Sequence, residues 1–474
     1  MLHAGILRGA VSVALIVLNG CATMDRSAGF TSVQFLAAEY GIARVHWRQG
    51  TKEDQEVTDG VRSLLVDELT ADEAVQIALL NNRDLQSTYE QLRIAQADLV
   101  QAGLLKNPVF DGSLRFTTAG GDPVADLGIA FDFLDVFFIP LRKAVAENEF
   151  EAAQLVVTGA VIDLAGKTRT TFYALQAAAQ TLEMRRSALA ATDAAYEMAR
   201  RIRAAGNSTR LRLANEQALY EEAKLAVVTA EEQAVALRAE LNRLMALFGD
   251  SSNWKLAPRL PEMPTEPLDT VRFEANALER SLDLRIARGE IDVAAKKLGI
   301  TKPLGILSEL ELGAAAELDA DSGWSVGPSL AFGLPIFSQG QPAVAKADAQ
   351  LRRAVNRYYS QAIAIRTAVR TAYARLQAAR GRALHFKRVI LPLRTFIVEE
   401  TQKEYNAMLV GVFELLQSKR DQIDAGRQYI EALRDYWIAR SELEQIAGGR
   451  LVEGGLALLS AGSYAPMASN GENH

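Results

Sequence analysis

The sequence predicts a mainly α-helical protein with a small membrane β-structure, built as an internal two-fold repeat. Landmarks near Ala78 return near Ala277, and a turn at Gly206 returns at Gly411. A repeat length of about 200 residues is far longer than the roughly 20–50 residues of solenoid units. Each half contains two short alternating segments followed by helical runs that are longer than a globular core requires. The pattern therefore indicates a duplicated half-molecule in which a few strands join very long helices.

The first 20 residues are predicted to form a signal peptide. Arg8 precedes the apolar stretch 11–18, which is too short to anchor the chain across a bilayer. The stretch ends at Leu18–Asn19–Gly20–Cys21–Ala22, which resembles the lipobox of bacterial lipoproteins. Cys21 is the only cysteine in 474 residues, so a disulfide does not explain it. The alternative is an ordinary cleaved signal with an incidental cysteine. Loss of Arg8 with the signal would take the formal net charge from −6 to −7.

Residues 21–68 are polar and show no clear periodicity, so an extended segment is expected there. The first repeat, 69–248, opens with a helix, because Thr70 lies three residues before Glu73 in the spacing of a capping box. Helical sequence continues to about Gly103, and Asn107–Pro108 ends it.

Each half contains alternating apolar and polar residues that predict a β-hairpin, over about 109–134 and about 307–333. In the first hairpin, Phe110, Leu114 and Phe116 share one face. Strands of about ten residues cross a bilayer when they are tilted. The alternative is an ordinary two-sided sheet packed on helices, but the neighbouring helices are too long to fold back over these strands.

The helical runs are the longest features of the chain. Residues from about 142 to 203 contain no proline, and some sixty helical residues make a rod of roughly 90 Å. A turn near Gly206 leads into a second run. In the second repeat, 268–448, the turn lies near Gly411, and Pro392 is expected to kink or break the rod before that turn. An a/d seam over about five heptads predicts a coiled coil. It comprises Val355, Tyr358, Ala362, Ile365, Val369, Ala372, Leu376, Ala379, Ala383, Phe386 and Ile390.

Two segments are expected to lie outside the repeats. Residues 249–267 predict a spacer rather than a core element, because prolines recur in them. These prolines are Pro258, Pro261, Pro264 and Pro267. Residues 449–474 are rich in glycine, alanine and serine and predict a flexible tail. No stretch after the signal has eighteen uninterrupted apolar residues, so the sequence predicts no transmembrane helix.

Four membrane strands cannot close a barrel, and lipid does not tolerate open strand edges. Several copies of the chain must therefore pool their strands: two would give eight, and three would give twelve. Long helical hairpins pooled in the same way would form a ring of antiparallel rods. The predicted assembly is a tube with strands in the membrane and coiled-coil walls outside it.

Several short motifs follow one another along the chain. They are Leu69–Thr70, Glu73–Ala74, Ala78–Leu79, Asn82, Asp84–Leu85, Asn107–Pro108, Leu334–Pro335–Ile336–Phe337 and Gly340. Taken in this order, they resemble the TolC-type outer-membrane efflux family in its lipidated branch, and the resemblance extends from Leu69 to about Ile446. It implies a homotrimer in which a twelve-stranded outer-membrane β-barrel, with four strands per chain, continues into a periplasmic α-barrel of coiled-coil hairpins.

The same resemblance implies the exit duct of a tripartite efflux system. Such a duct passes small molecules (drugs, solvents or metal ions) across the outer membrane from a periplasmic adaptor and an inner-membrane pump. Cys21 would carry a covalent lipid such as palmitate, and Ala22 in place of an aspartate favours the outer membrane and its lipid. Two alternatives stay open: a duct for protein secretion, and a lipid-anchored periplasmic coiled-coil adaptor with no pore.

The family's turn motif, a glycine followed by an acidic residue and two leucines, implies where the periplasmic mouth lies. Gly411 and Glu414 match it. Gln417 stands where relatives often carry a second acid, and Arg212 lies near the corresponding place of the first turn. Three copies of Glu414 would form a charged ring, with Arg212 as an ion-pair partner that holds the mouth shut. Solvated helix-end charges are the alternative. The turns expected to dock the adaptor contain Gly206, Asn207, Ser208, Val410 and Gly411.

No convergent catalytic or metal site is evident, so an enzyme is not expected. The 4 histidines stand far apart, the 8 methionines are dispersed, and no phosphate loop or nucleophile elbow occurs. No basic stripe with interleaved aromatic residues suggests a nucleic-acid partner. The sequence therefore predicts no metal and no cofactor apart from a covalent lipid on Cys21.

Overall fold

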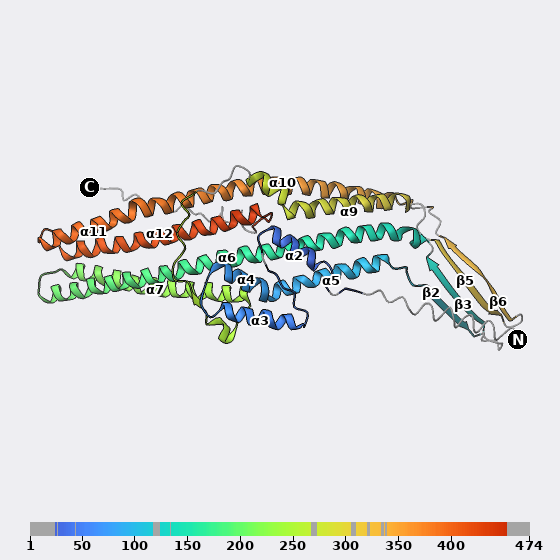
Figure 1. The fold of residues 1–474 in the computed structure, drawn as a ribbon, viewed down its shortest axis with the longest axis horizontal. Helices are drawn as coiled ribbons and strands as arrows, with labels where there is room; N and C mark the ends of the chain where they lie inside the picture. Colours follow the sequence, from blue (N-terminus) through green and yellow to red (C-terminus); the bar gives the residue numbers. More distant parts are fainter. Residues whose placement is uncertain are drawn as a thin grey trace. The chain divides into compact units, whose positions relative to one another are not determined.

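The computed structural model describes residues 24–25, 27–42, 44–116, 124–132, 134–266, 273–304, 310–319, 323–332, 336 and 339–452. Figure 1 shows their helices and strands. They belong to two compact units, of which the first falls within Met1–Val33, Tyr89–Val157 and Arg285–Tyr359. The second falls within Gln34–Thr88, Thr158–Leu284 and Ser360–His474. The predicted signal peptide, Cys21, most of the predicted tail, Pro267, Leu334–Pro335 and Phe337 lie outside the described residues.

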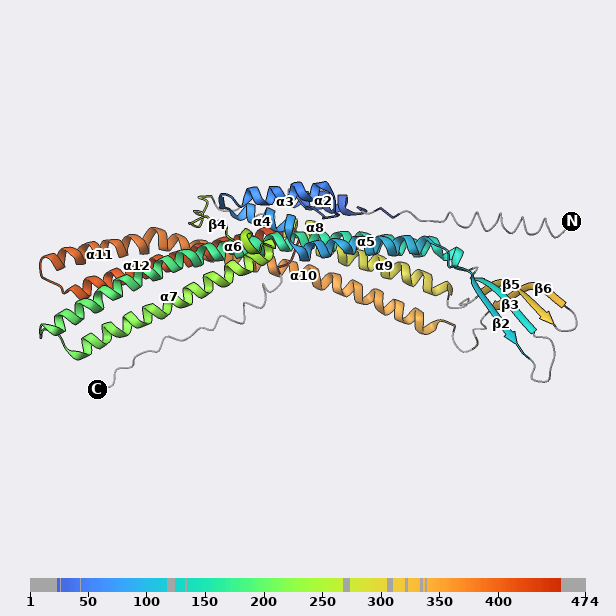
Figure 2. The ribbon, with the colours of Figure 1, turned by 90° about the horizontal axis from the view of Figure 1, so that it is seen from below.

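The first unit contains a four-stranded antiparallel sheet in the order β2-β3-β5-β6, drawn side by side in Figure 2. The two hairpins meet in its middle, where Ile129 of β3 is opposite Ala314 of β5. The outer strands, β2 and β6, each pair with one neighbour among the described residues. The strand bounds are Val109–Arg115 for β2, Val124–Asp132 for β3, Leu310–Asp319 for β5 and Gly323–Phe332 for β6.

The sheet leaves large apolar side chains uncovered. Phe110 is 69% exposed, Val326 is 75% exposed and Leu330 is 61% exposed. A sheet packed on helices would bury one face in a core. Within the described residues, this sheet therefore does not have the packing expected of an ordinary two-sided sheet covered by helices.

Long helices make up most of the remaining chain. They are α6 (Leu134–Ala204), α7 (Arg210–Met245), α10 (Gln341–His385), α11 (Leu391–Asn406) and α12 (Val412–Ala447). A π-helical segment, η2 (Phe386–Ile390), joins α10 to α11 directly before Pro392. The irregularity expected at this proline thus takes the form of a widened turn rather than an end of the helical run. None of the described helices is both long and apolar enough to span a bilayer.

The predicted a/d seam is buried through its central part. Six of its residues are less than 5% exposed: Ile365, Val369, Ala372, Leu376, Ala379 and Ala383. A larger core of the second unit includes Phe172 of α6, Leu241 of α7 and Leu433 of α12. Residues from both sequence halves therefore share one hydrophobic core.

The N-terminal segment was predicted to be extended, and this prediction was wrong. It contains α2 (Phe30–Glu39), α3 (Lys52–Leu64) and β1 (Glu68–Leu69). Val33 and Ala37, one helical turn apart on α2, are fully buried. In α2, six of the ten residues are apolar, so no single apolar face stands out. In α3, Val57, Val61 and Leu64 follow the helical spacing of four and three residues, a signal that the prediction overlooked.

The helix predicted from Thr70 to about Gly103 is interrupted at Asn82, which separates α4 (Ala71–Asn81) from α5 (Arg83–Gly103). The capping box of Thr70 and Glu73 is confirmed at the start of α4. Asn82 has an extended backbone, and its side-chain oxygen accepts a hydrogen bond from the backbone of Leu85 at 2.8 Å. Asn82 is thus the N-cap of the second helix.

The second half has the same break between α8 (Phe273–Arg280) and α9 (Leu282–Leu304). There Ser281 accepts the backbone hydrogen bond of Leu284 at 3.1 Å. Asn82 and Ser281 therefore both cap the helix that follows them, at corresponding places of the two halves.

The linker predicted as a spacer is partly a core element, so this prediction was wrong. It contains η1 (Gly249–Ser252) and β4 (Lys255–Leu256), and β4 pairs in parallel with β1. Trp254 is 3% exposed, and its indole nitrogen donates to Asn242 Oδ1 at 2.7 Å. Leu260 is also buried. The prolines shape a segment whose apolar side chains still anchor it to the second unit.

Candidate functional site at two helical hairpin tips

The first hairpin tip joins α6 to α7. Gly206 has φ of +81°, a left-handed conformation that favours glycine. Its backbone nitrogen donates to Arg203 O at 3.0 Å, and that of Asn207 donates to Ile202 O at 3.0 Å. These two bonds form the Schellman pattern that ends a helix. Thr209 then caps α7 by accepting the backbone hydrogen bond of Arg212.

The second tip joins α11 to α12 with the same backbone pattern. Leu409 N donates to Glu404 O at 2.9 Å, and Met408 N donates to Tyr405 O at 3.0 Å. The left-handed position is occupied by Met408, with φ of +60°, rather than by a glycine. A side chain there is strained by roughly 1–2 kcal/mol. Met408 is also 93% exposed and Leu409 is 76% exposed, so this tip presents apolar surface to solvent.

The Glu414 side chain caps the N-terminus of α12. Its carboxylate accepts a hydrogen bond from the backbone nitrogen of Gly411 at 2.5 Å. The carboxylate lies in the first turn of the helix, where the helix dipole favours a negative charge. Gln417 points to a different partner, because its amide donates to Asp421 Oδ1 at 2.7 Å. The structure therefore does not join Gln417 to Glu414.

The Arg212 side chain packs against α12 and is not a free solvated charge at the start of α7. Its guanidinium carbon is 4.4 Å from the centre of the Phe413 ring, a cation–π contact. The contact brings the start of α7 to the start of α12, one residue from Glu414. Among the described residues no ion pair joins Arg212 to Glu414.

Two further polar contacts near the tips were not evident from the sequence. Arg420 of α12 pairs with Glu216 of α7 at 3.5 Å. Arg394 of α11 pairs with Asp421 of α12 at 3.0 Å. The partners lie far apart in the chain, so only a correct assignment of helix faces could have indicated them.

The described residues of the tips include no set of metal-binding side chains. No group of three or more His, Cys, Asp or Glu residues within the described ranges could hold a metal ion. The tips instead combine rigid backbone turns, exposed apolar side chains and charged residues on neighbouring helix ends. Such a site can bind a partner or control passage by charge.

The comparisons with known proteins agree with this architecture. The sequence model of the family described as "Outer membrane efflux protein" matches residues 74–247 and 275–449. No match to the sequence occurs among curated proteins.

Several solved structures share the fold. A membrane protein from Pseudomonas aeruginosa has a TM-score of 0.66 and 18% identity, covering 80% of this chain and 93% of its own. The Campylobacter jejuni CmeC outer membrane channel has a TM-score of 0.64 and 16% identity, covering 82% and 88%. The open state of the Neisseria gonorrhoeae MtrE outer membrane channel has a TM-score of 0.65 and 17% identity, covering 81% and 90%. At these identities the likeness concerns the fold.

Proposed function

The chain belongs to the outer membrane efflux protein family, and we propose that it is the outer-membrane exit duct of a tripartite efflux system. A periplasmic adaptor and an inner-membrane pump would deliver the cargo. The cargo class is small molecules, such as drugs, solvents or metal ions. Lipid on Cys21 would add an anchor to the outer membrane.

The observation that carries the proposal is the sheet with exposed apolar side chains, whose two outer edges have no partner strand among the residues that the structure describes. Open edges in lipid leave backbone groups without hydrogen bonds, at a cost of several kcal/mol each. Pairing β6 of one copy with β2 of the next satisfies both edges. Three copies of the four-stranded sheet would then close a barrel of twelve strands.

The helices offer a second surface for the same assembly. One face of α7 is exposed at alternating steps of three and four residues, the spacing of a coiled-coil seam. Leu225, Val228 and Val235 on this face are each more than 60% exposed. The full face comprises Leu211, Ala214, Ala218, Glu221, Leu225, Val228, Glu232, Val235 and Ala239.

A second exposed apolar group lies in the π-helical segment and the start of α11, with Val389, Leu393 and Phe396. Packing of the α7 face of one copy against this group of the next copy would be a heterologous contact. Such contacts form closed rings when the rotation between copies closes, which supports a cyclic trimer.

The hairpin tips would form the periplasmic mouth. Three copies of Glu414, each beside an Arg212 held on Phe413, would place alternating charges around the opening and select or gate by electrostatics. Gln417 would line the same passage. The turns at Gly206–Ser208 and Val410–Gly411 would dock the adaptor, together with the exposed Met408 and Leu409.

The test is the native mass of the protein extracted in detergent from the outer-membrane fraction, followed by conductance in planar bilayers. The expected result is a stable trimer that conducts. The matched control is Cys21→Ser, which should lose the mass of the lipid but keep the trimer and its conductance. A monomer that is released without disrupting the bilayer would exclude the pore and leave a lipid-tethered coiled coil.

A further inference from the structure

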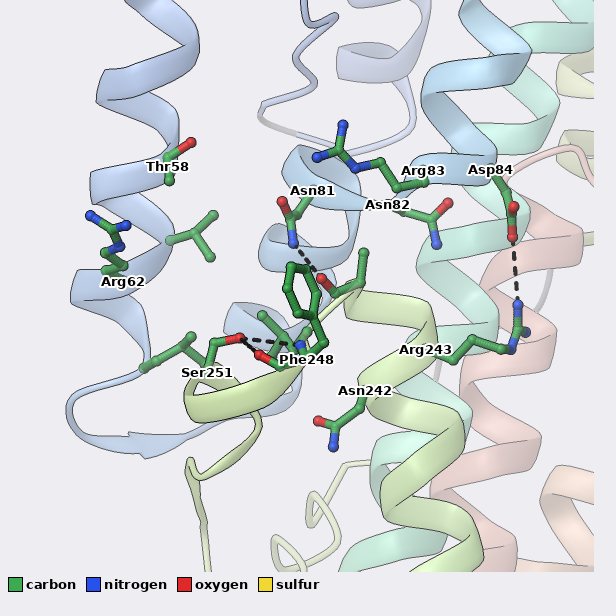
Figure 3. A pocket seen from close by; sticks show the side chains of 14 residues that line it. Thr58, Arg62, Asn81, Asn82, Arg83, Asp84, Asn242, Arg243, Phe248 and Ser251 are labelled. Carbon is green, nitrogen blue, oxygen red and sulfur yellow. Dashed lines mark hydrogen bonds and ion pairs between the residues drawn. The ribbon is translucent and has the colours of Figure 1, made fainter.

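A cavity of about 500 Å³ in the second unit is not used by the proposed duct (Figure 3). Its walls come from α3, from the junction of α4 and α5, and from the end of α7 with the loop that follows. All of these segments belong to the second unit. The apolar part of the wall includes the buried Val61 and Leu247.

Phe248 is the most exposed apolar residue of this cavity, at 82%. Figure 3 draws its ring among the polar side chains of the wall. Both polar groups of its backbone are fixed by Ser251: Phe248 N donates to Ser251 Oγ at 3.2 Å, and the same hydroxyl donates to Phe248 O at 2.7 Å. An exposed aromatic ring on a fixed backbone loses little conformational entropy when it binds a partner.

The turn that presents Phe248 is itself strained. Ala246 has φ of +52°, where glycine is usual. Asn81 holds this conformation by donating to Met245 O at 2.9 Å and to Ala246 O at 3.0 Å. Strained, over-determined backbone of this kind clusters at binding sites.

The cavity wall is cationic, although the whole chain has a formal net charge of −6. Its charged residues are Arg62, Arg83, Arg243 and Asp84. Arg243 is neutralised by Glu240 and Asp84. Within the described residues, Arg62 forms an ion pair only with the exposed Asp59, at 3.1 Å, and a surface pair of this kind contributes little.

Arg83 has no ion pair within the described part of the chain. Its neighbour Arg48 donates to Asn81 Oδ1 and likewise has no ion pair there. Burial lowers the pKa of Arg48, and the positive charge of Arg83 lowers it further, while the carboxylate of Asp54 opposes this shift. Two guanidinium groups close enough to repel each other favour the approach of an anion.

We propose that this cavity docks an acidic segment of a partner protein, with carboxylates on Arg83 and Arg62 and an apolar side chain against Phe248. Arginine forms bidentate hydrogen bonds with carboxylates. Exposed aromatic residues and arginines are the residue types that dominate binding energy at protein interfaces. The charge favours an acidic peptide over a neutral glycan. This docking site lies on α3 and the end of α7, so it does not depend on the proposed pore.

The experiment is photo-crosslinking in cells of a Gram-negative host, with the full chain carrying p-benzoylphenylalanine at position 248. The control carries it at Phe35, which is 67% exposed on α2 in the same unit. We expect one protein adduct at position 248 and none at position 35. Mass spectrometry should place the crosslink in a segment with a net negative charge. Arg62→Gln with Arg83→Gln should reduce the adduct at least tenfold, and Arg259→Gln, on an exposed arginine paired with Glu183, should leave it unchanged.

Four outcomes would overturn the proposal. The adduct could be a second copy of this chain, which would make the cavity part of the contact between copies. It could be sensitive to lysozyme, which would identify a glycan polymer. It could also be absent, or persist in full after both arginines are replaced. Yield and trimer mass of each variant, measured in the same samples, show whether a lost adduct comes from misfolding.

Discussion

Arg420 of α12 and Glu216 of α7 form an ion pair that connects the two helical hairpins near their tips. The distance between Arg420 Nη1 and Glu216 Oε2 is 3.5 Å, and the side chains are 15% and 9% exposed. The residues are 204 positions apart in the chain. A pair so little exposed to water is screened weakly, so it resists relative movement of the hairpins more than the surface pairs do.

We expect Glu216→Gln to lower the free energy of unfolding by about 3 kcal/mol, because it leaves the Arg420 guanidinium buried without a counter-charge. The double variant Glu216→Met with Arg420→Met should lose less unfolding free energy than the sum of the losses in Glu216→Met and in Arg420→Met, since it removes both charges. Urea unfolding of the detergent-extracted protein, followed by circular dichroism, measures both. Strict additivity of the two substitutions would show that the pair is not coupled.

The equivalent caps of the two halves give a second prediction. Asn82→Ala removes the cap of Leu85 and also the donor to Leu244 O at 2.8 Å, so it should cost about 2 kcal/mol. Ser281→Ala removes one cap only and should cost about 1 kcal/mol. Asn82→Asp keeps the acceptor for Leu85 and should recover part of the loss. Equal costs for the two alanine variants would contradict the second role of Asn82.

The stabilising contribution of the ionised Glu240 carboxylate should depend on pH. Hydrogen bonds from Arg243 at 2.8 and 2.9 Å, helped by Lys167 at 3.2 Å, lower the pKa of Glu240 from 4.5 to about 2. Because the folded pKa is depressed, this stabilisation is complete above pH 4.5 and is lost as the pH falls towards 2. Glu240→Gln should therefore lower the melting temperature at pH 6, and the difference from the unsubstituted protein should shrink steadily below pH 4.5. A difference that stays constant down to pH 2.5 would show that the lost contact is not the ionised one.

Local patterns in the sequence predicted much of the fold. The capping box at Thr70 and the a/d seam through Ile365 are signals within a few residues of one another, and both occur in the structure. The strand pairs lie where period-two alternation predicts them. The buried Trp254 was missed because prolines around it dominate the local pattern, while its burial depends on distant segments.

The candidate site was less predictable for the same reason. Gly206 marks its turn because glycine tolerates a left-handed backbone. Met408 occupies the same conformation without any sequence signal. The contacts of Arg212 with Phe413 and of Glu216 with Arg420 join helices from different halves of the chain. Their pairing depends on how the hairpins face each other, which spacing within one helix does not reveal.

Gly206 and Met408 occupy the same left-handed position in the two tips, and substitutions there should change stability in opposite directions. Gly206→Ala places a side chain at φ of +81° and should cost about 1 kcal/mol, although no atom lies within 4 Å of the added carbon. Met408→Gly relieves the strain at φ of +60° but increases the entropy of the unfolded chain, so it should gain about 0.5 kcal/mol. Met408→Ala keeps the strain and removes only the exposed side chain, so it should leave stability within about 0.5 kcal/mol of the unsubstituted protein. Urea unfolding of the three variants separates these effects. A similar loss of stability in Met408→Gly and Met408→Ala would show that contacts of the methionine side chain, rather than the backbone, stabilise the second tip.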